Sequence, residues 1–70
     1  MSVQATYKQC NAIRAIAYRK LNQRPSDYLP DSDIVEFVND QLHLDLDPQK
    51  PMRDQLTMES ASDIINRLTA

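Results

Sequence analysis

Two pairs of prolines, Pro25 with Pro30 and Pro48 with Pro51, divide this chain of 70 residues into three longer segments. Proline ends a helix because it has no backbone N–H and because its ring clashes with the preceding turn. Each longer segment repeats apolar residues at the spacing of an α-helix. The chain has no glycine, so its helices must end at Asn22 or at proline, and glycine-rich phosphate loops are excluded. These features predict an all-α fold.

The first predicted helix covers residues 6–22. Thr6 followed by Gln9 is a capping box, in which each side chain bonds the backbone N–H of the other residue. The apolar positions that follow form one stripe at helical spacing: Cys10, Ile13, Ile16, Ala17 and Leu21. This stripe predicts that one side of the helix faces a core.

Two further helices are predicted over residues 32–44 and 57–69. Asp31 or Ser32 is expected to cap the second helix, and Thr57 is expected to cap the third. The second stripe contains Ile34, Phe37, Val38 and Leu42, and the third contains Ala61, Ile64, Ile65 and Leu68. The facing core positions are expected to be Ile13, Ile16, Phe37, Val38, Ile64 and Ile65.

The connections between these helices are predicted to be ordered. "QRPSDYLP" reads as a turn, and "HLDLDPQKPMRDQ" reads as a loop with room for one short helical turn. Four apolar side chains in these connections are expected to fold back onto the core: Tyr28, Leu29, Leu44 and Leu46. The sequence therefore predicts a single small three-helix domain over residues 1–70, with a proline-interrupted loop before the last helix.

Chain length restricts the classes of function. A core of this size gives about 3–5 kcal/mol of net stability, so a large buried catalytic cleft is not expected. The N-terminus has no apolar signal-peptide core, and no apolar run is long enough to span a membrane. The single cysteine, Cys10, excludes an internal disulfide and fits a reducing compartment. We therefore expect a cytoplasmic protein without a membrane partner.

Charge is distributed unevenly along the chain. Residues 1–26 carry five cations and no acid, residues 27–47 carry seven carboxylates and no Lys or Arg, and residues 48–70 carry three of each sign. Such a division can present a basic face to phosphates, or it can pair the first helix with the second. We favour internal pairing or simple solvation. The overall acidity of the chain, with a pI of about 5.1, is unfavourable for independent nucleic-acid binding.

The residue types used by enzymes are present, but not in catalytic patterns. His43, Asp45 and Asp47 would share one side of an extended "HLDLD" segment and could ligate a metal. We favour the simpler interpretation, in which an exposed polar edge alternates with the buried Leu44 and Leu46. Cys10 lies on the predicted apolar stripe, and Ser60 and Ser62 lie where hydroxyls cap helices. We therefore expect no enzyme, no cofactor and no metal.

Both ends of the chain resemble a known module. "ATYKQCNAIRAIAYRK" is similar to A-T-x-K-Q-x-x-A-I-x-A-I-A-x-R-K, and "QLTMESASDIINRL" is similar to L-T-x-E-x-A-S-x-I-I-x-x-L. Together these motifs resemble a small helical module at the C-terminal end of some bacterial and phage single-strand annealing proteins of the recombination type. The two motifs also resemble short free-standing proteins of unassigned function that consist of this module. Because the annealing core is absent, the resemblance implies an accessory module near DNA metabolism.

Two functional classes remain. We favour a protein-interaction or adaptor module, a monomer or a homodimer, in which a groove between the first and third predicted helices, or the acidic surface of the second, docks a peptide or a basic partner. The alternative is a weak single-stranded nucleic-acid-binding module, with cations on phosphates and tyrosines stacking on bases. The candidate binding surface consists of Tyr7, Lys8, Arg14, Tyr18, Arg19, Lys20 and Arg24.

Overall fold

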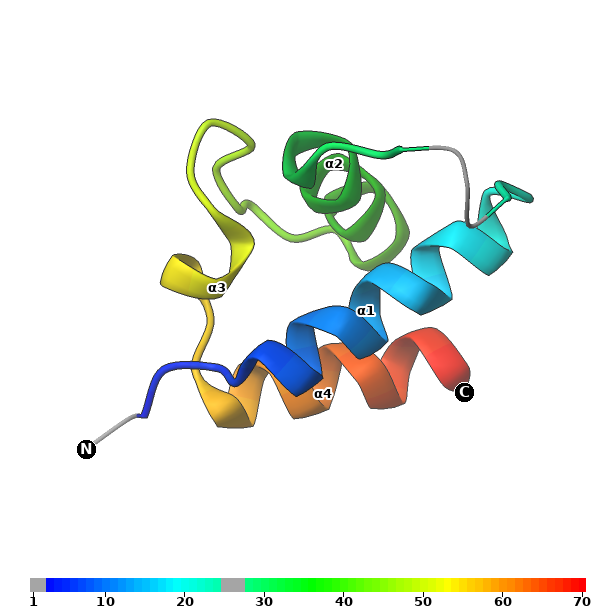
Figure 1. The fold of residues 1–70 in the computed structure, drawn as a ribbon. Coiled ribbons are helices and arrows are strands. Elements are labelled where there is room, and N and C mark those ends of the chain that lie inside the picture. The colour runs from blue at the N-terminus through cyan, green and yellow to red at the C-terminus, as the bar shows by residue number, and fades with distance from the viewer. Residues whose placement is uncertain (1–2, 25–27) are drawn as a thin grey trace.

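The computed structural model of the protein describes residues 3–24 and 28–70. Within these ranges the chain forms four helices: α1 (Tyr7–Lys20), α2 (Asp31–Leu42), α3 (Met52–Gln55) and α4 (Met58–Thr69) (Figure 1). The all-α prediction is thus confirmed, whereas the expected count of three helices is wrong. The predicted turn around Pro25 lies partly outside the described residues.

The fourth helix, α3, lies inside the connection that was expected to be a loop. It begins after Pro51, whose φ of −57° is compatible with a helix start, where the missing proline N–H is tolerated. Met52 is only 2% exposed, so this short helix is anchored by burial of its first side chain. Helical periodicity cannot reveal an element of four residues, because such an element is too short to show a stripe.

Local hydrogen bonds set both ends of α1. The Gln9 N–H donates to Thr6 Oγ1 at 3.1 Å and the Thr6 N–H donates to Gln9 Oε1 at 3.1 Å, which confirms the capping box. At the other end Asn22 has a φ of 60°, the left-handed conformation usually taken by glycine. The Gln23 N–H then donates to the Tyr18 carbonyl at 2.9 Å, so the end of α1 is closed without glycine.

The remaining long helices differ in how they begin. The Thr57 side chain accepts from the Ser60 N–H, and the Ser60 hydroxyl accepts from the Thr57 N–H, so the predicted cap of α4 is present as a capping box. In contrast, α2 begins after Pro30 with no side-chain cap, so the predicted cap at Asp31 or Ser32 is wrong. The Asp31 carboxylate is instead bonded to other helices, as described below.

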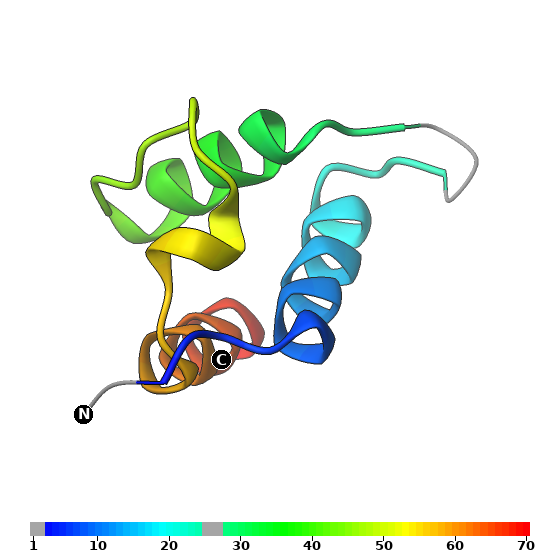
Figure 2. The same cartoon turned by 60° about the vertical axis from the view of Figure 1, so that its left-hand side comes forward.

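The four helices enclose one core. Figures 1 and 2 show α1 and α4 beginning at the same end of the molecule, and α2 packs against both. There the N-terminal segment meets the start of α4: the Ala5 N–H donates to the Leu56 carbonyl at 2.9 Å, and the Met58 N–H donates to the Val3 carbonyl at 2.8 Å. The buried side chains are Ala5, Ile13, Ile16, Ala17, Ile34, Val35, Phe37, Val38, Met52, Leu56, Ala61, Ile64 and Leu68.

All but two of the predicted core positions are buried or packed partly buried against the core. Tyr28 is 80% exposed and Leu21 is 40% exposed, so both predictions are wrong. Cys10, Leu42 and Ile65 are only partly buried, although all three pack against the core. The other connection residues expected to fold back, Leu29, Leu44 and Leu46, also pack against the core. The sequence analysis missed the burial of Ala5, Val35, Met52 and Leu56.

Candidate functional site

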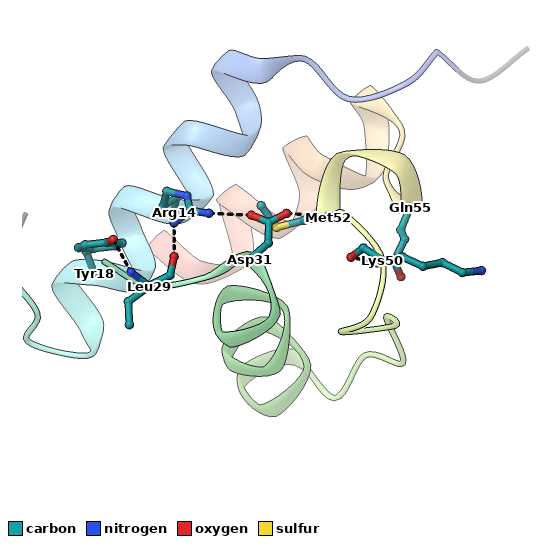
Figure 3. Close-up of polar contacts among 7 residues, drawn as sticks. All are labelled: Arg14, Tyr18, Leu29, Asp31, Lys50, Met52 and Gln55. Carbon is teal, nitrogen blue, oxygen red and sulfur yellow. Dashed lines mark hydrogen bonds and ion pairs between the residues drawn. The ribbon is translucent and has the colours of Figure 1, made fainter. Parts of the chain in front are cut away.

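Two residues of the predicted binding surface, both on α1, bond to the segment that leads into α2. The Arg14 guanidinium donates to the Leu29 carbonyl through Nη1 and to Asp31 Oδ1 through Nη2, the latter at 2.7 Å (Figure 3). The Tyr18 hydroxyl accepts a hydrogen bond from the Leu29 N–H at 2.9 Å. Arg14 and Tyr18 therefore fasten the entry to α2, and their polar atoms are already used inside the molecule.

Asp31 extends this contact to a third helix. Its Oδ2 accepts a hydrogen bond from the Met52 N–H at 3.0 Å, while its Oδ1 is bonded to Arg14. One carboxylate thus joins α1, α2 and α3, as Figure 3 shows. This contact is the internal pairing of basic and acidic segments that the charge distribution suggested. Among the described residues it is the only ion pair between α1 and α2.

The other predicted surface residues lie on the outside of the molecule. Tyr7 is 71% exposed, and Lys8, Arg19, Lys20 and Arg24 are exposed as well. In the part of the chain that the structure describes, Lys8, Arg19 and Lys20 form no ion pair. The seven predicted residues therefore do not act as one set, because two hold the fold together and five face solvent.

An open groove follows the exposed side of α1. It has a volume of about 590 Å³ and is lined by Asn11, Arg14, Ala15, Tyr18, Arg19 and Gln23. We call it the α1 groove. Ala15 and the Tyr18 ring supply apolar surface, and Arg19 supplies a cation without an ion pair in the described chain. This combination of apolar surface and charge suits a docked polypeptide.

A smaller cavity lies where α1 meets the first residues of α2 and α3. It has a volume of about 250 Å³ and is lined by Tyr7, Cys10, Asn11, Arg14, Asp31, Pro51, Met52 and Arg53. We call it the α1–α3 niche. It shares Asn11 and Arg14 with the α1 groove, so the two hollows adjoin along the same helix.

Arg53 is the residue of this niche that the sequence analysis missed. Its guanidinium carbon lies 4.0 Å from the centre of the Tyr7 ring, a cation–π contact that typically contributes about 0.5–2 kcal/mol. Its Nε atom is buried and has no hydrogen-bond partner among the described residues, an arrangement that typically costs about 1–3 kcal/mol. No sequence pattern places Arg53 beside Tyr7, because the two residues are brought together only by the packing of α3 on α1.

The Cys10 thiol is not an activated nucleophile. Burial raises the pKa of this thiol, the nearby Asp31 carboxylate raises it further, and the Arg53 guanidinium opposes both effects. A thiol with a raised pKa stays protonated at neutral pH, and the thiolate is the reactive form. Cys10 is partly buried and packs against the core.

The "HLDLD" segment is held by the side-chain amide of Asn39. The Asn39 side chain donates to the Leu46 carbonyl at 2.8 Å and accepts from the Leu46 N–H at 3.0 Å. His43 has a φ of 55° at the end of α2, so the segment does not begin as an extended strand. No group of three His, Cys, Asp or Glu side chains that could hold a metal ion occurs in residues 3–24 and 28–70.

Acidic residues of α2 surround a separate hollow. Asp33, Glu36 and Asp40 are exposed there, above apolar surface from Leu21 and Phe37. This hollow combines apolar surface with carboxylates, whereas the α1 groove combines apolar surface with cations. Within the described residues, none of these three carboxylates forms an ion pair.

Comparison with known proteins returns no relative. No protein-family model, curated protein or solved structure matches the chain. The resemblance to the recombination-protein module therefore stays a prediction. No helix in the described part of the chain is both long enough and apolar enough to cross a membrane.

Proposed function

We propose that this protein is a non-enzymatic protein-interaction module whose α1 groove docks an acidic segment of a partner protein. The observation that carries the proposal is Arg19, an exposed cation that borders apolar groove surface and has no ion pair in the described chain. Charge complementarity at such a rim speeds association and selects the partner. If the resemblance of the two chain ends holds, the partner belongs to DNA metabolism.

The length of the groove limits what can dock. Within α1 the groove extends from Asn11 to Arg19, a distance of about 12 Å along the helix axis. A docked helix of about two turns, or an extended segment of about four residues, would cover this length. Both are ordinary modes of peptide recognition by small domains.

Single-stranded nucleic-acid binding is the second candidate function. It is favoured by the exposed ring of Tyr7 beside the Arg53 guanidinium, because a base can stack on such a ring. It is disfavoured because Arg14 and Tyr18 are already hydrogen-bonded to Leu29 and Asp31 within the molecule. The exposed carboxylates of α2 also repel phosphates.

Site-specific photo-crosslinking tests the docking proposal. A photoreactive amino acid replaces Ala15, an exposed residue of the α1 groove, and in a matched control it replaces Ser62, an exposed residue of α4. We expect the Ala15 probe, used in the producing cell, to crosslink to an acidic segment of one protein. Arg19→Glu should weaken this crosslink, whereas the Ser62 probe should not form it.

The same variants distinguish the second candidate. Fluorescence anisotropy with a labelled single strand should show only weak binding at physiological salt. Micromolar or tighter binding that is lost in Arg19→Glu/Lys20→Glu would overturn the docking proposal and support nucleic-acid binding. In that case the logarithm of affinity should fall with the logarithm of salt by roughly 0.7 for each phosphate contacted.

A further inference from the structure

We propose that the α1–α3 niche binds the carboxylate group of one acidic side chain, with Arg53 as the anion-binding residue. The inference rests on the proposed function, because that side chain would belong to the segment docked in the adjoining α1 groove. The niche would anchor the docked segment at one defined point, through a carboxylate. Arg53 was not part of the surface predicted from the sequence.

The size of the niche selects a single side-chain head group. At about 250 Å³ it is smaller than the pockets that hold small-molecule ligands or cofactors, which typically begin near about 300 Å³. A carboxylate on a short stem fits a space of this size. Small pockets that receive one partner side chain are common anchor points in protein interfaces.

The charges around the niche leave one cation uncompensated. Asp31 is neutralised, because its Oδ1 is bonded to Arg14 at 2.7 Å and its Oδ2 accepts from the Met52 N–H at 3.0 Å. Arg53 has no ion pair in the described chain, and its Nε–H has no acceptor there. An incoming monoanion would therefore meet one unpaired guanidinium and a carboxylate whose oxygens are both occupied.

Tyr7 holds the Arg53 guanidinium in place before any ligand arrives. The guanidinium carbon lies 4.0 Å from the ring centre, so the flat faces of the two groups can remain in contact while the guanidinium edge turns toward an acceptor. A positioned arginine loses less conformational freedom on binding than a mobile one. The Nε atom itself is buried, so a carboxylate in the niche would have to accept from the terminal Nη groups of Arg53.

The position of the niche favours a carboxylate over the nucleic-acid backbone. The niche is formed where three helices meet, so it admits a group at the end of a stem. A phosphodiester is flanked by a sugar on each side, so it needs more room than a carboxylate at the end of a side chain. A side chain from a segment in the α1 groove can enter, because Asn11 and Arg14 border both hollows.

NMR titration with small probes tests this site without any partner protein. The probes are N-acetylglutamate N-methylamide, its glutamine counterpart as the uncharged control, and dimethyl phosphate as the phosphodiester mimic. We expect the glutamate probe to shift the Arg53 Nε–H signal and the backbone signals of Cys10 and Met52 in a saturable way. A dissociation constant in the millimolar range is expected for one such group.

Matched variants assign the effect to Arg53. Arg53→Gln should weaken binding about tenfold or more, because it removes the charged donor. Arg67→Gln makes the same chemical change at an exposed position of α4 and should leave binding unchanged. Arg53→Lys keeps the charge and should bind with intermediate strength, because it lacks the paired donors of arginine. Retained thermal melting by circular dichroism confirms that each variant is folded.

Several results would overturn the inference. These are the absence of a saturable shift with the glutamate probe, equal binding in folded Arg53→Gln, or equal binding of the glutamine probe. Dimethyl phosphate binding as tightly as the glutamate probe would assign the niche to phosphate instead. Because this titration needs no partner, loss of the Ala15 crosslink would refute docking in the α1 groove without affecting the niche result.

Discussion

At the scale of single residues, Asp31 joins α1, α2 and α3 through its two carboxylate oxygens. Sequence patterns suggested a local role for this residue, as a helix cap. The side chain instead accepts from the Met52 N–H, which lies 21 residues further along the chain. A cap accepts a hydrogen bond from a first-turn N–H of its own helix, whereas this contact fixes the positions of three helices relative to one another.

The first prediction concerns the ion pair formed by Asp31 and Arg14. Both side chains are partly exposed, so we expect a coupling free energy of about 0.5–1 kcal/mol in a double-mutant cycle of Asp31→Asn and Arg14→Gln. Urea unfolding of the four proteins measures it. The control is the exposed pair on α4, in which Arg67 Nη1 lies 3.7 Å from Asp63 Oδ2. This pair should couple by about 0.5 kcal/mol or less. A coupling of zero for Arg14 with Asp31 would contradict the structural role assigned to the pair.

At the scale of elements, the glycine-free chain ends its helices with other residues. Asn22 ends α1 and His43 ends α2, both with positive φ. Asparagine tolerates this left-handed conformation better than most residues, so the end of α1 was predictable from the sequence. The end at His43 contradicts the prediction that the helices end at Asn22 or at proline, since His43 takes the left-handed conformation there.

The second prediction concerns α3, which has little intrinsic stability at four residues. Its stability should depend on Met52, which is 2% exposed. Met52→Ala should lower the free energy of unfolding by about 2–5 kcal/mol, because it leaves a cavity between α3 and the core. Met58→Ala is the matched control, since Met58 is 42% exposed and its truncation should cost far less. Equal melting temperatures for the two variants would show that α3 does not depend on this burial.

At the scale of the whole molecule, contacts between distant parts of the chain complete the core. Backbone bonds from Val3 and Ala5 join the N-terminal segment to the start of α4. Met52 from α3 and Leu56 from the next connection add side chains that the three long helices lack. The core therefore belongs to the whole described chain, and removing one central side chain should affect all of it.

The third prediction concerns Ile13, which is fully buried. Ile13→Asp would place an unpaired charge in the core of so small a protein and should abolish the cooperative thermal transition followed by circular dichroism. Ala15→Asp makes the same addition on the exposed side of α1 and should preserve that transition. The assignment of the α1 core face would be wrong if Ile13→Asp melted at the temperature of the parent protein.

The sequence by itself determined the features that depend on neighbours along the chain. Apolar spacing located α1, α2 and α4, and the capping partners of Thr6 and Thr57 lie three residues away. Tertiary structure alone decided the features that join distant residues. Arg14 reaches Asp31 across 17 positions, and Arg53 reaches Tyr7 only because α3 packs against α1. Periodicity and capping act within about one helical turn, so they predict elements, whereas the niche and its unpaired guanidinium exist only after those elements have packed.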